Sequence, residues 1–182
     1  MELTASKFRT KDLAYIAVSV ALTAICSWIS IPTAVPFTLQ TMAVFLSVGL
    51  LGGRRGSLAV LAYILLGLVG APVFAGFSGG AGVLLRPTGG YIVGFLFTAL
   101  LMWAMERLPG RRLPVLGLSM VLGLLVCYAF GTVWFMAVYA RDTGPISLTT
   151  ALGWCVIPFI IPDLVKIGLA LSLVSQLRRH VK

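Results

Sequence analysis

Long apolar stretches separated by short polar or basic turns define this chain. The stretch from Leu13 to Gly53 contains no charged residue and is long enough for two membrane spans, folded back at a turn marked by Pro32 and Pro36. The pattern of apolar runs and breaks continues toward the C-terminus, although prolines make the stretch 146–161 less regular. The predicted helices cover roughly residues 12–31, 38–52, 57–70, 88–106, 114–139 and 163–177.

The composition places these helices in a membrane. Of the 182 residues, 59% are hydrophobic and only 10% are charged, with a mean hydropathy of +1.05. Soluble domains do not reach such values. A span needs about 20 helical residues, so the chain has room for roughly six spans and little else. We therefore predict an all-α membrane protein with six transmembrane helices, organised as a single integral membrane domain over residues 1–182.

The basic residues predict the orientation of the helices. The net charge is +9, but the cations lie in the turns between apolar runs and not in a patch suited to nucleic acid. Arg86 and Arg141 fall on one side, and Lys166 falls within a span. By the positive-inside rule, the N- and C-termini are both expected to be cytoplasmic. The basic residues assigned to the cytoplasmic side are Lys7, Arg9, Lys11, Arg54, Arg55, Arg107, Arg111, Arg112, Arg178, Arg179 and Lys182.

The stretch Ala71–Tyr91, APVFAGFSGGAGVLLRPTGGY, interrupts the helical pattern. Its six glycines and two prolines exclude an ordinary helix through it. Irregular backbone near a membrane is tolerated only where protein or a water-filled cavity satisfies its N–H and C=O groups. We predict that this loop is irregular and forms one wall of a binding site, on the same outer side as the turn 32–40.

One acid and one base lie inside the last apolar region. The spacing of Asp163 and Lys166 places them on one helical face, and ionisable residues within a span are costly and mark functional sites. The preceding Pro162 predicts that a helix restarts at Asp163. The two side chains either neutralise each other as a simple ion pair or bind a ligand. Arg86 on the same side leaves a net positive charge, which an anion with a further hydrogen-bonding group would balance.

The sequence gives little support for nucleotide binding, metal binding or catalysis. The glycine-rich loop lacks the Gly-Lys-Ser/Thr ending and the preceding strand of a phosphate-binding loop. The three cysteines have no metal-ligand spacing, so we predict no metal site and no cofactor. The five acids are scattered, and no nucleophile has an adjacent base. A membrane enzyme acting on a lipid is thus only an alternative, and we predict no catalytic residues.

A stripe of small residues runs along the first helix. Ala14, Ala17, Ala21 and Ala24 recur at spacings of three and four residues, which allows another helix to approach closely in lipid. The stripe either packs inside the protein or receives a separate membrane subunit. A chain without an ATPase motif needs such a subunit if it accumulates a solute.

Several motifs together resemble the BioY family, the biotin-specific S components of energy-coupling factor (ECF) transporters, over nearly the whole chain. They are Pro-Phe-Thr-Leu-Gln-Thr at 36–41, Gly79-Gly80, Arg-Pro-Thr-Gly-Gly-Tyr-Ile-Val-Gly-Phe at 86–95 and Pro-Phe-x-x-Pro-Asp-Leu-Val-Lys at 158–166. The resemblance implies the six-helix S-component fold in a bacterial or archaeal plasma membrane. It also implies an outward-facing biotin pocket, capped by the loops between helices 1 and 2 and between helices 3 and 4.

The resemblance also implies partners and site residues. Two cytoplasmic ATPases would supply energy through the transmembrane coupling subunit EcfT, which Ala17 and Ala21 would contact. Asp163 would accept hydrogen bonds from the ureido group of biotin, and either Lys166 or Arg86 would neutralise its carboxylate. The expected biotin-binding residues are Asp163, Lys166, Arg86, Tyr91 and Gln40. An S component for another carboxylated vitamin is the alternative within the same fold.

Overall fold

The computed structural model describes residues 9–33, 35–107 and 112–178 of a helical bundle. Four of the predicted cytoplasmic basic residues, Lys7, Arg111, Arg179 and Lys182, lie outside these ranges. The elements in chain order are α1 (Thr10–Trp28), β1 (Ser30–Ile31), β2 (Phe37–Thr38), α2 (Gln40–Leu51), α3 (Gly53–Leu68), the 3-10 turn η1 (Ala75–Phe77), α4 (Ala81–Leu84), α5 (Gly89–Arg107), α6 (Leu113–Asp142), α7 (Leu148–Cys155) and α8 (Ile157–Leu177).

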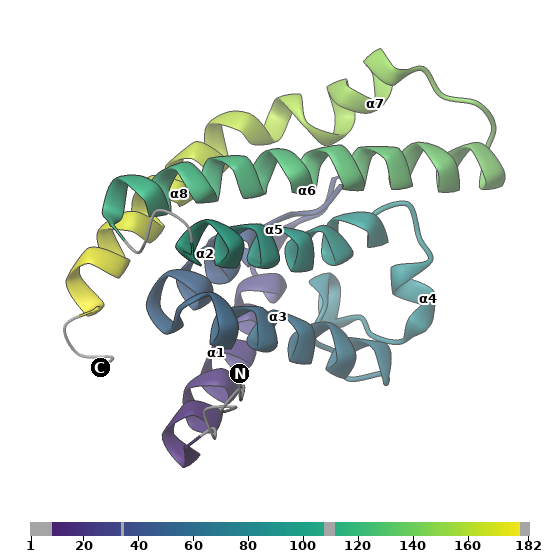
Figure 1. The fold of residues 1–182 in the computed structure, drawn as a ribbon. Helices are drawn as coiled ribbons and strands as arrows, with labels where there is room; N and C mark the ends of the chain where they lie inside the picture. The colour runs from purple at the N-terminus through teal and green to yellow at the C-terminus, as the bar shows by residue number, and fades with distance from the viewer. Residues whose placement is uncertain (1–8, 34, 108–111, 179–182) are drawn as a thin grey trace, which may run out of the picture.

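The long helix α6 organises the bundle. Figure 1 shows it running along the molecule, with α5 packed beneath it and α7 above it, while α8 continues from α7 down past the left end of α6. Helix α2 packs against α3 and α8, and α1 packs against α2 and α3. Nine of the twelve residues of α2 are buried, so this helix lies in the interior. That position explains why it is apolar on every side and has no polar stripe.

Within the described ranges, four helices are long and apolar enough to cross a membrane. They are Thr10–Trp28, Gly89–Arg107, Leu113–Asp142 and the nearly continuous Leu148–Leu177. Helix α2 is apolar but shorter, and α3 carries basic residues in its first turn. The prediction of a mostly helical protein with several helices able to span a membrane is confirmed, whereas the count of six spans and the cytoplasmic position of both termini remain predictions.

The turn after α1 is more ordered than the sequence suggested. Helix α1 ends at Trp28, and β1 then pairs antiparallel with β2, with Ser30 opposite Thr38 and Ile31 opposite Phe37. The predicted first helix, which extended to residue 31, was therefore too long. The pairing satisfies backbone groups that a membrane environment would otherwise leave without partners.

The glycine-rich stretch is also partly regular. It contains η1 and α4, and α5 begins at Gly89, so Tyr91 belongs to a helix. Gly76 and Gly80 have φ values of 67° and 94°, a region that side-chain-bearing residues rarely adopt. These two glycines allow backbone conformations within η1 and just before α4 that other residues would adopt only under strain.

The prediction that a helix restarts at Asp163 is wrong. Helix α8 begins at Ile157 and contains Pro162 in its interior. Such a proline costs about 3 kcal/mol, but the first turn of α8 buries Phe159, whose ring stacks on Phe37 with centroids 5.9 Å apart. Packing of this turn against the hairpin offsets the local cost, so the segment stays helical. Asp163 thus lies in the second turn of α8.

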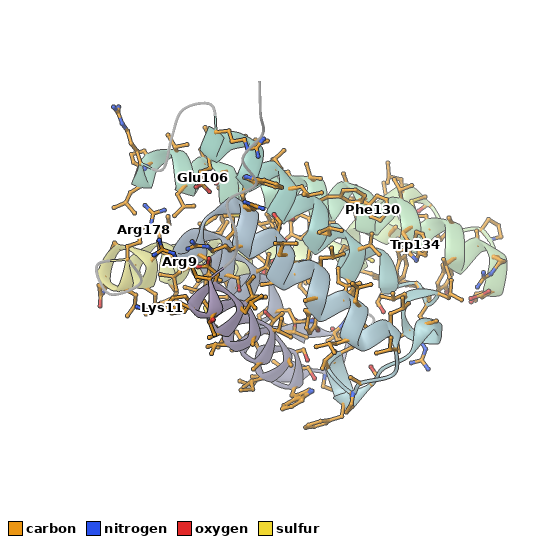
Figure 2. All side chains as sticks on the ribbon, turned by 60° about the horizontal axis from the view of Figure 1, so that its bottom comes forward. Arg9, Lys11, Glu106, Phe130, Trp134 and Arg178 are labelled. Carbon is orange, nitrogen blue, oxygen red and sulfur yellow. The ribbon has the colours of Figure 1, made fainter. Side chains whose placement is uncertain are left out.

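The two ends of the bundle differ in character. Arg9, Lys11 and Arg178 lie at one end, and Trp134 lies toward the other (Figure 2). The second end also holds α4 and the turn between α6 and α7 (Figure 1). The two ends are called the basic end and the loop end below.

Candidate functional site

A cavity of about 160 Å³ lies among the hairpin, the glycine-rich loop and helices α2, α5, α6, α7 and α8. All five residues predicted to bind the ligand line it, although they come from four separate parts of the chain. They are Gln40, Arg86, Tyr91, Asp163 and Lys166. The structure therefore brings the predicted set together around one space.

Asp163 and Lys166 form a buried ion pair on α8. Lys166 Nζ donates to Asp163 Oδ1 at 2.7 Å, and the two residues are only 3% and 4% exposed. A lone charge at this depth would be very costly, and pairing with hydrogen bonding offsets much of that cost. The helical spacing alone brings the two groups together, as the sequence predicted.

Two aromatic residues complete the surroundings of the pair, and both were missing from the predicted site. Tyr128 on α6 donates to the second oxygen of Asp163, Oδ2, at 2.5 Å. Lys166 Nζ lies 4.2 Å from the centre of the Phe37 ring, a cation–π distance. Phe37 belongs to the motif 36–41 and was thus within reach of sequence reasoning. Tyr128 gave no signal beyond being a polar group in an apolar helix.

Gln40 is held by a chain of buried hydrogen bonds. Its Oε1 accepts from Thr38 Oγ1 at 3.0 Å, and its Nε2 donates to Tyr63 Oη at 2.5 Å. Tyr63 Oη in turn donates to the carbonyl of Val73 in the glycine-rich loop, at 2.9 Å. Ser27 Oγ at the end of α1 donates to the same carbonyl, at 2.6 Å. Gln40 therefore connects the cavity wall to the loop above it.

Tyr91 and Arg86 occupy different environments. Tyr91 is 8% exposed, and its hydroxyl is 3.0 Å from Thr132 Oγ1, so its ring forms a fixed wall. Arg86 is exposed, and its backbone carbonyl accepts from Trp134 Nε1 at 3.2 Å. The backbone is thereby anchored while the guanidinium remains near solvent at the mouth of the cavity.

The charges of the cavity lining do not cancel. Among the lining residues, the charged side chains are Asp163, Lys166 and Arg86, which leaves one positive charge in excess. Apolar side chains such as Phe95, Leu124 and Phe159 form much of the remaining wall. Within the described residues, no group of three or more His, Cys, Asp or Glu side chains is placed to hold a metal ion. The cavity is suited to a partly apolar ligand with one negative charge and a polar group that reaches Asp163.

Comparison with known proteins supports one family. Residues 2–182 match the sequence model of the BioY family. The chain is 41% identical over 160 residues to the biotin transporter BioY of Thermotoga maritima, covering 87% of this chain and 90% of that protein. It is 39% identical over 171 residues to a probable biotin transporter BioY of Pyrococcus horikoshii, covering 93% and 98% respectively.

The fold comparison agrees with the sequence comparison. The crystal structure of the S-component for biotin from an ECF-type ABC transporter matches with a TM-score of 0.83 at 29% identity, covering 96% of each chain. On the family match and on these relatives, the chain belongs to the BioY family.

Proposed function

We propose that this chain is the biotin-binding S component of an ECF transporter and mediates biotin uptake. The family match and the biotin transporters among its relatives support this function. The main structural observation in favour of this function is the cavity, which contains the buried Asp163–Lys166 pair and has a net charge of +1. Biotin has one carboxylate, an apolar chain, and a neutral ureido group that donates and accepts hydrogen bonds. No catalytic residue is needed for this role.

Burial favours one orientation of biotin in the cavity. Transfer of a carboxylate to a buried position costs far more than transfer of a neutral ureido group. Asp163 and Lys166 are almost fully buried, whereas Arg86 is exposed at the mouth. We infer that the ureido group meets Asp163 and Lys166, and that the carboxylate meets Arg86. Tyr91 and the apolar lining then cover the ring and chain, and Gln40 has a second amide hydrogen to donate.

The experiment is isothermal titration of purified wild type and Arg86→Gln with biotin and with biotinamide, which lacks the carboxylate charge. Loss of a charge-assisted hydrogen bond costs about 1.5–3 kcal/mol. Arg86→Gln is therefore expected to weaken biotin binding by roughly tenfold or more, and to change biotinamide binding little. Arg141→Gln is the control, because Arg141 is an exposed arginine toward the same end that lines no described cavity.

The outcomes separate the function from the orientation. A well-folded wild type that does not bind biotin would contradict the proposed function. Unchanged biotin affinity in Arg86→Gln would contradict the orientation alone and would point to Lys166 as the carboxylate partner.

We further propose the topology and the partners that this function requires. Six spans place both termini in the cytoplasm, with the basic end inward and the loop end outward, and a single domain covers residues 1–182. Ala17 and Ala21 on α1 are exposed, which favours contact with the coupling subunit EcfT over internal packing. Two cytoplasmic ATPases would act through that subunit. Labelling of single cysteines at each end in intact cells measures the topology, and co-purification measures the assembly.

A further inference from the structure

A second hollow adjoins the cavity at the loop end. It has a volume of about 410 Å³, within the range of small-molecule sites. Its lining comes from the hairpin connection, the loop before α5, the C-terminal part of α6, and α7: Thr33, Pro36, Arg86, Pro87, Thr88, Phe135, Tyr139 and Trp154. This space is called the outer groove below.

The outer groove and the cavity lie on either side of a shared set of residues. Pro36, Arg86 and Thr88 line both spaces, so these three residues form the boundary between them. Arg86 is exposed, whereas the acid and base at the other side of the cavity are buried. A ligand that reaches Asp163 from the loop end would therefore pass this boundary.

An aromatic wall lines the other side of the outer groove. The rings of Phe135 and Tyr139 stack with centroids 5.6 Å apart and an interplanar angle of 17°. The Trp154 ring meets Tyr139 edge to face at 6.0 Å. Trp154 is 44% exposed, and Phe135, at 3%, is fixed in the bundle. The wall thus offers an apolar surface held in place by packing.

The chemistry of the outer groove matches the chemistry of the cavity ligand. Among the described residues that line the groove, Arg86 is the only charged one. One cation at the edge of an aromatic wall complements a molecule with one carboxylate and an apolar body. A lipid acyl chain would fit against the aromatic wall, but it has no negative charge to pair with Arg86.

We propose that the outer groove is a vestibule that binds biotin before it enters the cavity. This inference rests on the proposed function and adds a separate site to it. Arg86 holds the carboxylate in the vestibule and keeps it while the ring of biotin moves past Pro36 toward Asp163. The aromatic wall contacts the ligand on the way in and out, but not in the final complex.

Loss of a contact that biotin makes only in the vestibule has a characteristic effect on the rate constants of binding. The dissociation constant depends only on the free and the final bound states, so loss of a contact made only in between leaves it unchanged. The association and dissociation rate constants must then change by the same factor. Both fall because the aromatic wall still contacts the ligand in the rate-limiting step, when the ring of biotin passes Pro36. Loss of one aromatic contact is expected to lower both by about three- to tenfold.

The experiment measures both rate constants for radiolabelled biotin on purified wild type, Trp154→Leu and Tyr139→Leu. Trp154→Phe tests rescue, because it keeps an aromatic ring. Phe97→Leu is the control, since Phe97 is a partly exposed aromatic residue of α5 that lines neither space. Thermal unfolding verifies that each variant is folded. If one leucine variant does not fold, the other leucine variant provides the measurement.

Parallel slowing of both rates in the leucine variants, with recovery in Trp154→Phe, supports the vestibule. Unchanged rates in both leucine variants overturn it, and the groove is then a lipid-facing hollow. An increase in the dissociation rate alone also overturns it, because the aromatic wall would then belong to the final site. If wild type does not bind biotin, the proposed function itself fails and the vestibule fails with it. The wild-type titration therefore distinguishes the two failures.

Discussion

Replacing Asp163 by asparagine tests whether the buried pair binds ligand or only stabilises the fold. The change leaves Lys166, which is 4% exposed, without its anionic partner at 2.7 Å. Breaking one side of a buried ion pair costs about 3–5 kcal/mol, whereas replacing both partners with apolar residues of similar size is often neutral. Asp163→Asn is therefore expected to lower the free energy of unfolding by several kcal/mol. The double change Asp163→Leu with Lys166→Met is expected to restore most of it.

The biotin affinities of these variants are not expected to follow their stabilities. Asp163 accepts from Lys166 and Tyr128 and still has lone pairs for the ureido N–H groups of biotin. Loss of this acceptor costs about 1.5–3 kcal/mol of binding energy, which is roughly tenfold or more in affinity. Both the single and the double variant should therefore bind biotin weakly, although only the single variant is unstable.

The assays are unfolding in mixed detergent and SDS micelles, and isothermal titration with biotin. The double variant is decisive because it separates the two roles. If it is stable and binds biotin as tightly as wild type, the pair has no part in the site. If the single and double variants are equally stable, the energetic argument from burial is wrong.

Two further predictions concern the walls of the cavity. A Cβ added at Gly131 would lie 2.2 Å from the Tyr91 ring, so Gly131→Ala should displace that ring and lower both the melting temperature and biotin affinity. Gly153→Ala is the matched control, since nothing lies within 4 Å of its added Cβ, and equal effects of the two would refute the reasoning. Tyr63→Phe removes the hydroxyl that donates to the Val73 carbonyl and accepts from Gln40 Nε2, and should raise the biotin dissociation rate about fivefold, the equivalent of about 1 kcal/mol. A dissociation rate equal to that of wild type, measured with radiolabelled biotin, would show that these two hydrogen bonds restrain neither the loop nor Gln40 in the bound state.

The sequence predicted the helices well where local physics decides them. A charge-free run such as 13–53 can adopt few structures in a membrane, because every backbone N–H and C=O group needs a partner within the protein. Short-range spacing was equally informative, since Asp163 and Lys166 meet through the period of one helix. The motifs also identified the family, and with it a set of residues that the fold gathers around one cavity.

Local rules failed where packing competes with them. Pro162 predicted a break in the helix, but the burial of Phe159 against the hairpin keeps α8 continuous. Similarly, the first helix was predicted too long because the uncharged run continues through Ser30 and Ile31, which pair as a strand instead. In both cases the contacting residue comes from another element, which a local pattern does not contain.

The sequence by itself determined a helical membrane protein of the BioY family, with an acid and a base one turn apart in its last span. Only the tertiary structure decided that Tyr128 donates to that acid, that Phe37 covers the base, and that Arg86 lies where the cavity meets the outer groove. The physical reason is the separation along the chain of the residues that interact. Helix formation and i,i+3 pairing depend on neighbours in the chain, whereas contacts between helices depend on how the buried faces of the whole bundle pack.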